Sequence, residues 1–403
     1  MIPEIRDKFN AAFDQKRYEA FIQDIDRSYK NSLEFRVSET PLFLSGELTR
    51  QLIEASYEVM AVLRQSDYKE KAQHAIPPGM AVANEDDHTT FLQIDFAICR
   101  DENGEFIPQL IELQGFPSLY CYQHYLQGKI RQYFPIPEDF TPFFSGLDSE
   151  SYKTFFGKVL LGDSDPKNVA LLEFQPEKQK TRIDFYLCEE YFGIRPVCVT
   201  KVIHRGRKLF YRHEGREIPI ERVYHRFIFD ELLRMNVQTS FRWDEDLDLK
   251  WVGHPNWFFK ISKYTLPLIH SRYCPPCYYL QDLTEYPSDL ENYVLKPLFS
   301  FAGLGVEIEV TRQLLDSIKD RDNYILQRKI EYAPLIKTPD EYAKAEVRMM
   351  FVWDEEPRLV NNLLRQSKGK MMGVDFNKNK TWVGSSVAYH RGGGQGAEIP
   401  AGG

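Results

Sequence analysis

The sequence lacks the features that would place it in a membrane or an exported class. No apolar run approaches the roughly 18 residues that a membrane-spanning helix needs, and residues 1–17 mix charges instead of forming a signal peptide. Six cysteines in 403 residues are too few for a disulfide scaffold. We therefore expect a cytoplasmic protein with reduced thiols and no membrane partner.

Positive charge and metal-binding patterns are also scarce. Lys and Arg number 51 against 59 Asp and Glu, a net charge of −8, which argues against a dedicated nucleic-acid binder. The nine histidines show no ligand spacing. Cys274-Pro-Pro-Cys277 is a lone C-x-x-C motif, and we interpret it as a rigid loop rather than as a zinc or redox site, because no second pair is present. Small-molecule chemistry is the class that remains.

What the chain does have is an ordinary globular composition, with 43% hydrophobic and 27% charged residues. Its length favours two or three subdomains around a cleft. We expect N-terminal helices and a hairpin in residues 1–160, an α/β subdomain in 161–250, a strand-rich segment in 251–390 and a flexible glycine-rich tail in 391–403.

Local patterns predict individual elements within these segments. Residues 1–66 are predicted to be helical, and residues 168–230 to form an α/β unit in which Gly193 ends a helix and Glu214-Gly215 turns a hairpin. Further strands are predicted at Tyr293–Leu298, Val306–Val310, Tyr324–Gln327 and Glu346–Trp353.

The most informative pattern is a hairpin in residues 91–115. If Asn103-Gly104 forms a two-residue type I′ loop, Asp95 faces Glu112 across the strands, and Gln93 faces Gln114 on the same side. The opposite side is apolar: Leu92, Ile94, Phe96, Ile98, Ile111 and Leu113.

Two carboxylates about 5 Å apart repel by roughly 3 kcal/mol at an effective dielectric of 20. A divalent cation such as Mg²⁺, held by carboxylate and amide oxygens, would offset that repulsion. The alternatives are charges that fan out into water, or one carboxyl whose raised pKa lets it share a proton.

Several cations follow in the C-terminal half. Lys296 precedes Gly303 and Gly305, which would let backbone amides approach a phosphate, although a plain hairpin with a surface lysine has the same pattern. Lys263 lies in an aromatic, apolar context and needs an anionic partner. Arg365 could clamp a phosphate or form a surface ion pair.

Glu346 and Arg348 share one face of a predicted strand. They could pair with each other or contact a ligand, and the sequence leaves both possibilities open.

Together these residues resemble the amide-ligase domain of glutathionylspermidine synthases, which has a circularly permuted ATP-grasp fold. The matching motifs span roughly residues 90 to 390. They are Ile94-Asp-Phe96, Leu110-Ile-Glu-Leu-Gln-Gly-Phe-Pro-Ser118, Val223-Tyr-His-Arg226, Pro255-Asn-Trp257, Ser262-Lys-Tyr-Thr-Leu-Pro267, Tyr293-Val-Leu-Lys-Pro297, Gly303-Leu-Gly-Val306, Tyr324-Ile-Leu-Gln327 and Leu364-Arg-Gln-Ser367.

The resemblance implies an ATP-grasp-like α/β protein in which a βαβ-type subdomain, residues 161–250, precedes the ATP-binding segment. It implies an ATP- and Mg²⁺-dependent ligase that joins a small carboxylate to an amine through an acyl phosphate. A nucleotide-binding protein of this fold that no longer ligates is the alternative.

Roles for individual residues follow from the resemblance alone. Asp95, Glu112 and Gln114 would hold Mg²⁺, Lys263 and Lys296 would bind the ATP phosphates, and Gly303 and Gly305 would lie in the loop above them. Gln327 would line the adenine slot, and Arg365 would steady the transferred phosphoryl group. Two positions depart from the family pattern: Gln114 stands where the family has Asn, and Gln93 where it has the Arg expected to neutralise an acyl phosphate or a substrate carboxylate.

Overall fold

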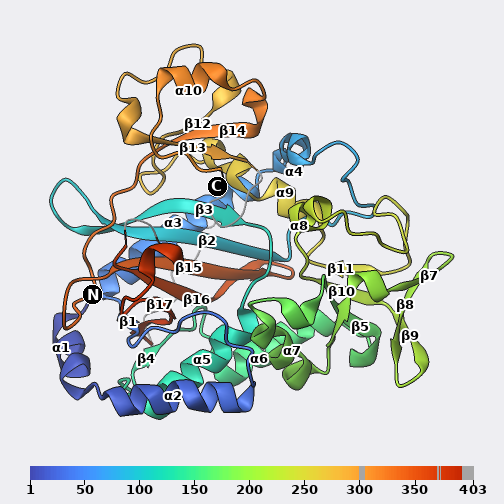
Figure 1. Cartoon of the computed structure of the whole chain (residues 1–403), viewed down its shortest axis with the longest axis horizontal. Coiled ribbons are helices and arrows are strands. Elements are labelled where there is room, and N and C mark those ends of the chain that lie inside the picture. The colour runs from blue at the N-terminus through green and yellow to red at the C-terminus, as the bar shows by residue number, and fades with distance from the viewer. Residues whose placement is uncertain (299–304, 370–371, 373, 393–403) are drawn as a thin grey trace.

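The computed structural model describes residues 1–298, 305–369, 372 and 374–392. Within them the chain forms a mixed α/β structure with five sheets (Figure 1). No helix in these ranges is both long and apolar enough to cross a membrane.

The central sheet has five antiparallel strands in the order β17-β16-β15-β2-β3. Its strands are β2 (Phe91–Arg100), β3 (Phe106–Gln114), β15 (Lys344–Trp353), β16 (Pro357–Ser367) and β17 (Gly384–Ser386). One side packs against α3 (Gly46–Leu63), whose N-cap Ser45 accepts a hydrogen bond from the Leu48 amide. Alternating apolar residues bury that side, so the intervening polar residues lie on the other.

The β2–β3 hairpin has the expected pairs but a different turn. Asp95 pairs with Glu112 and Gln93 with Gln114, as predicted. The turn is not a two-residue type I′ loop, because the Asp101 amide donates to the Glu105 carbonyl and Gly104 alone has positive φ, at 83°. This closes a three-residue loop, and pairs near the turn are therefore shifted by one residue.

A β-bulge at Ile111 restores the expected register. Phe96 pairs with Leu110 while Asp95 pairs with Glu112, so Ile111 has no partner on β2. The error in the predicted turn and the undetected bulge each move the pairing by one residue, in opposite directions. The two carboxylates therefore still face each other.

The α/β subdomain contains a parallel sheet in the order β11-β10-β5-β6. Its elements are β5 (Val169–Glu173), α7 (Arg182–Phe192), β6 (Arg195–Cys198), β10 (Arg222–His225) and β11 (Lys250–Val252). Gly193 ends α7 with φ 71°, as predicted. A second sheet of β7 (Ile203–Arg205), β8 (Lys208–His213) and β9 (Arg216–Ile220) contains the predicted turn at Glu214-Gly215, where both residues have positive φ.

A small antiparallel sheet, in the order β12-β14-β13, lies at one end of the molecule beside α10 (Figure 1). Its strands are β12 (Cys277–Tyr279), β13 (Tyr293–Pro297) and β14 (Tyr324–Arg328), and α10 spans Arg312–Ser317. The prediction of a strand at Val306–Val310 was wrong: only Glu307 pairs, in an isolated bridge to Leu295. A single bridge does not form a strand, and the residues after Glu307 lead to α10 without further pairing.

The first 66 residues are only partly helical. Helices α1 (Pro3–Ala12) and α2 (Gln15–Ser28) are followed by an extended segment that includes β1 (Leu42–Phe43). Strand β1 pairs in parallel with β18 (Ala388–Arg391), which also pairs with β4 (Phe140–Thr141). The segment after α2 is extended because its backbone forms hydrogen bonds to this C-terminal strand. Helical periodicity in the sequence does not reveal such a distant partner. Of the expected tail, residues 393–403 lie outside the described residues.

The remaining helices and 3₁₀ turns connect these sheets. They are α4 (Tyr68–Lys71), α5 (Tyr120–Tyr133), α6 (Ser149–Leu161), α8 (Phe229–Arg234), α9 (Asn256–Lys260), η1 (Ala72–Ala75), η2 (Pro166–Asn168), η3 (Pro176–Lys178), η4 (Val199–Lys201), η5 (Lys263–Leu268), η6 (Leu280–Asp282), η7 (Leu290–Asn292), η8 (Arg321–Asn323) and η9 (Val374–Asn377). The expected subdomain boundaries stay predictions. The central sheet combines two of those segments, since β2 and β3 come from the first and β15 to β17 from the third.

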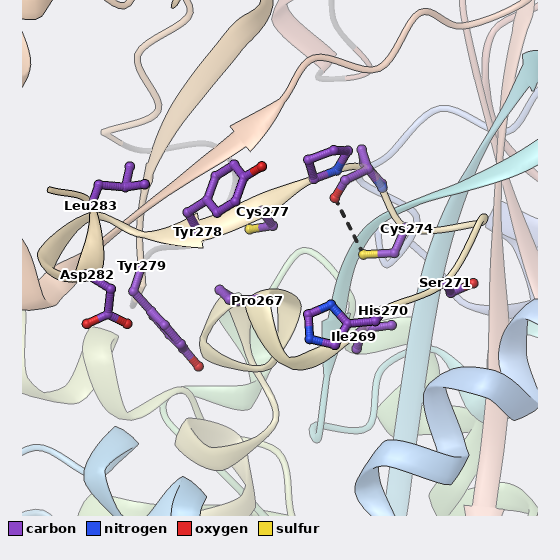
Figure 2. A pocket seen from close by; sticks show the side chains of 12 residues that line it. Pro267, Ile269, His270, Ser271, Cys274, Cys277, Tyr278, Tyr279, Asp282 and Leu283 are labelled. Atoms are coloured by element: carbon purple, nitrogen blue, oxygen red, sulfur yellow. Dashed lines mark hydrogen bonds between the residues drawn. The ribbon is translucent and has the colours of Figure 1, made fainter. Parts of the chain in front are cut away.

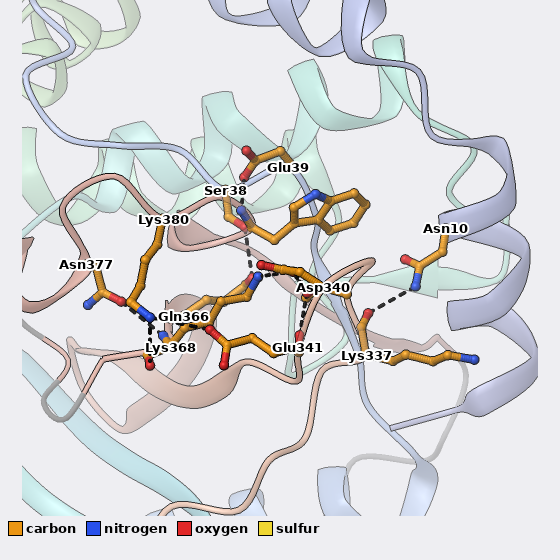
Figure 3. A network of polar contacts seen from close by, with 12 residues as sticks. Asn10, Ser38, Glu39, Lys337, Asp340, Glu341, Gln366, Lys368, Asn377 and Lys380 are labelled. Atoms are coloured by element: carbon orange, nitrogen blue, oxygen red, sulfur yellow. Dashed lines mark hydrogen bonds and ion pairs between the residues drawn. The ribbon is translucent and has the colours of Figure 1, made fainter.

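A polar network fixes the end of β16 (Figure 3). Ser38 donates to the Gln366 side-chain oxygen at 2.8 Å, and Gln366 donates in turn to the Thr40 carbonyl at 2.6 Å. The fully buried ammonium of Lys368 pairs with Asp340. The network ties the strand that carries Arg365 to the N-terminal segment and to the loop before β15.

Glu173, at the end of β5, gives a prediction about stability. Its side chain is buried, and burial raises its pKa to about 8, against the opposing effects of the Phe174 amide and Arg226. The unfolded chain ionises near 4.5, so stability is greatest below that pH and falls as the pH rises toward 8. Glu173→Gln should therefore stabilise the protein more at pH 8 than at pH 5 in thermal unfolding. The exposed Glu177→Gln should show no such trend, and an equal gain at both pH values would contradict this prediction.

Candidate functional site

The polar side of the central sheet carries a cluster built around Asp95. Arg348 lies directly opposite Asp95 in the β2–β15 pairing and donates from Nε to Oδ1 at 2.6 Å and from Nη2 to Oδ2 at 2.7 Å. Arg365, on β16, donates to Oδ2 at 2.6 Å. Burial alone would raise the pKa of Asp95, which is 2% exposed, but the two guanidinium groups hold that pKa below its usual value. Asp95 is therefore a buried anion that anchors two arginines.

Glu346 extends the cluster along β15. It pairs with Arg365 rather than with Arg348, and the Tyr332 hydroxyl donates to its Oε2 at 2.9 Å. Burial raises the pKa of Glu346, against the opposing charge of Arg365. Arg365 is 37% exposed, whereas the side chains of Asp95 and Glu346 are 2% and 3% exposed. Arg365 is therefore the member of this cluster that a ligand can reach.

Glu112 acts electrostatically both on this cluster and on two lysines. Burial lowers the pKa of Lys296, on β13, and of Lys263, in η5, while the Glu112 carboxylate opposes that effect on both. Lys296 also depresses the pKa of Lys263, as expected for neighbouring ammonium groups. In the described ranges no side-chain hydrogen bond or ion pair is recorded for Glu112 itself. The structure thus brings together the carboxylate and both predicted lysines.

Close packing between the backbone after β3 and the segment before Lys263 fixes the position of that lysine. Gly115 follows β3 directly, and a Cβ atom there would lie 2.5 Å from the Trp257 carbonyl oxygen. The Gly115 amide donates to the Ile261 carbonyl at 3.0 Å, two residues before Lys263. A side chain at this position would push the lysine segment away from the sheet.

The small sheet contacts β3 at the bulge. Lys296 Nζ donates to the Ile111 carbonyl at 3.4 Å, and Gln327 Nε2 donates to the Leu110 carbonyl at 3.4 Å. Gln327 is 1% exposed, and its side-chain oxygen has no hydrogen-bond partner among the described residues. A buried acceptor in this position fits a ligand that brings a donor.

Gln93 and Gln114 form an amide pair beside Asp95. Gln93 donates to the Ser118 carbonyl at 2.7 Å, and its oxygen accepts from Gln114 and, at 3.1 Å, from Arg348 Nη1. Gln93 therefore contributes no charge, but it fixes the guanidinium of Arg348. Of the glycine loop, Gly303 lies outside the described residues, and Gly305 is exposed with φ 72°.

A separate cavity of about 560 Å³ lies beside β12 (Figure 2). None of the predicted site residues lines it. Cys274 and Cys277 are on its wall as free thiols, and burial raises the pKa of Cys274 to about 12. A thiol of raised pKa is a poor metal ligand and a poor nucleophile at neutral pH.

Three residues of the cluster were not assigned from the sequence: Arg348 and Glu346, whose partners were left open, and Tyr332. The polarity of positions 346 and 348 within an apolar strand was the available signal. The partners themselves depend on β15 lying beside β2, and neither strand's own pattern specifies that.

The donor set fits Mg²⁺, the ion that the sequence resemblance implies, only in part. Glu112 offers a carboxylate and Gln114 an amide oxygen, both of which suit this cation. Asp95 does not fit in this conformation, because both of its oxygens already accept from arginine. No group of three or more His, Cys, Asp or Glu side chains suited to a metal was found in the described part of the chain.

Comparisons with known proteins give a fold but no family. No family model matches the chain, and no curated protein matches it. Among solved structures, a glutathione synthetase-like effector from Globodera pallida, in its apo form, is similar with a TM-score of 0.55 and 10% identity. The match covers 94% of this chain and 97% of that chain.

At this identity the similarity concerns the fold alone. The chain has a mixed α/β fold that is similar overall to that of this glutathione synthetase-like effector. The circular permutation stays a prediction, as do the roles assigned to the site residues.

Proposed function

We propose that this protein is an ATP-dependent ligase that joins a carboxylate to an amine through an acyl phosphate. The observation that carries the proposal is that one carboxylate, Glu112, acts electrostatically on Lys263, Lys296 and Arg365. Three cations reached from separate elements suit a triphosphate, whose charge is spread over several oxygens.

The reaction has two steps. A carboxylate oxygen attacks the γ-phosphorus of ATP, the bond to the β–γ bridging oxygen breaks, and ADP leaves. The amine nitrogen then attacks the acyl carbon, inorganic phosphate leaves, and the nitrogen loses a proton to give the amide. Such chemistry needs charge neutralisation and positioning more than covalent work by the protein.

Each residue has a place in this scheme. Lys263 and Lys296 bind the ATP phosphates, and Arg365, whose side chain is partly exposed, neutralises the transferred group. The side-chain oxygen of Gln327, which has no partner in the part of the chain that the structure describes, accepts from the amino group of adenine. Gly303 and Gly305 belong to the loop over the phosphates, and Gln93 orients Arg348.

Glu112 and Gln114 are the residues that would hold Mg²⁺. When bound, the ion neutralises phosphate charge. Glu112 also carries the negative charge that opposes the lowering of the pKa of both lysines by burial. The identities of the acid and the amine stay open.

Calorimetry and a product assay test the proposal together. We expect ATP to bind more tightly with Mg²⁺ than with EDTA, and ADP to appear when pooled amino acids, glutathione and polyamines are added. Glu112→Ala should remove the Mg²⁺ dependence and should also lower stability, because it takes a carboxylate away from the buried Lys263 and Lys296. Absence of both nucleotide binding and ADP release would refute the ligase.

The alternative is a nucleotide-binding protein that no longer ligates. The neutral amide of Gln93 favours it, since no positive charge comes from that position. It predicts ATP binding without ADP release under every substrate mixture. The same two measurements therefore separate the two functions.

A further inference from the structure

Asp95 and Arg348 form a bidentate ion pair. Two parallel N–H···O bonds at 2.6 and 2.7 Å join them, and Arg365 adds a third bond to the same carboxylate. The side chain of Arg348 is 11% exposed and that of Asp95 is 2% exposed. An ionised carboxylate offers about four lone-pair sites, so one is left.

These three hydrogen bonds make metal binding by Asp95 unfavourable. A cation on the remaining lone pair would lie close to two guanidinium groups in a poorly solvated place, where like charges repel strongly. To bind metal with a second oxygen, the carboxylate would have to give up a bidentate arginine pair, among the strongest side-chain interactions in proteins.

The pairing is part of the fold and not a chance contact of surface side chains. Arg348 is the direct cross-strand neighbour of Asp95, and Gln93 accepts from the Nη1 of the same guanidinium at 3.1 Å. Gln93 is held in turn by Ser118 and Gln114. Three strands and the loop after β3 therefore fix one guanidinium against one carboxylate.

We propose that Arg348 takes the place of a metal ion at Asp95, so that a divalent cation in this site is bound by Glu112 and Gln114 without Asp95. The inference refines the metal part of the proposed function. Charge supports it, because four cations, Arg348, Arg365, Lys263 and Lys296, already face three carboxylates, Asp95, Glu112 and Glu346. Arg348 acts through Asp95 and is a positioning residue.

Binding of Mn²⁺ alone, counted from the electron paramagnetic resonance signal of the free ion, tests the inference without any activity assay. In the wild-type background, Asp95→Asn should change Mn²⁺ affinity less than threefold. Arg348→Gln should raise affinity at least tenfold, because it frees one carboxylate. The double variant should return to the wild-type value, and Glu112→Ala should weaken binding in every background.

The outcomes decide the inference separately from the ligase. A loss of tenfold or more in Asp95→Asn alone would show that Asp95 is a ligand and would overturn it, as would unchanged affinity in Arg348→Gln. If Arg348→Gln does not fold, Arg348→Lys keeps one charge but loses the bidentate geometry and should give an intermediate gain. Failure of the proposed function is seen elsewhere, as absence of ATP binding in the wild type.

Discussion

Replacing Lys296 by methionine is expected to weaken ATP binding by at least about 30-fold, the equivalent of the ~2 kcal/mol typical of a hydrogen bond to a charged group. The methionine keeps a long apolar side chain on β13 but removes the ammonium group that lies close to Glu112. Calorimetry with ATP and Mg²⁺ measures the loss. Lys208→Met, on the exposed part of β8, is the matched control and should bind like the wild type.

The pH dependence of binding has a definite sign. Burial lowers the pKa of Lys296 and Lys263, so both lose their protons at a lower pH than an exposed lysine does. Phosphate favours the charged form, so ATP affinity should fall as the pH rises through this lowered range, and binding there should take up protons. Buffers of different ionisation enthalpy detect the uptake. Equal affinity and no uptake in Lys296→Met and wild type would contradict the role of this lysine.

Replacing Asp95 by alanine is expected to lower the free energy of unfolding by about 3–5 kcal/mol, the usual effect of removing one partner of a buried ion pair. The variant leaves the largely buried Arg348 without a carboxylate, whereas Arg365 keeps Glu346. Urea unfolding followed by circular dichroism measures the loss.

The control for Asp95→Ala is Asp139→Ala. Asp139 also pairs with an arginine, Arg391, but at 3.5 Å and with 61% of its side chain exposed. Its loss should change stability by less than about 0.5 kcal/mol, as is usual for exposed sites. If Asp95→Ala proved as mild as this control, the arginine pair would not be a structural anchor.

The hairpin shows how much of the strand pairing a local sequence pattern can predict. The pairing of Asp95 with Glu112 was correct although the turn was not, because the bulge at Ile111 offsets the one-residue shift that the three-residue loop introduces. The bulge escaped notice because Leu110 and Ile111 are both apolar. A polar residue at either position would have shown which side chain leaves the core.

The predictions for two other elements were wrong for a different reason. The segment after α2 looked like a continuation of helix, yet its partner, β18, lies more than 300 residues away in the sequence. The strand predicted at Val306–Val310 had suitable residues but only one bridging neighbour. Strand formation needs a partner, and the partner is not part of the local pattern.

The sequence alone determined that Gln93, Asp95, Glu112 and Gln114 share the polar side of the hairpin, because side-chain alternation along a strand is a local property. The family resemblance, and not a local pattern, grouped Asp95 and Glu112 with Lys263 and Lys296. Only the tertiary structure decided how they are paired, since β2 and β15 are about 250 residues apart and become neighbours only when the sheet assembles. In the assembled structure two guanidinium groups bind the Asp95 carboxylate. Glu112 instead acts electrostatically on the two lysines.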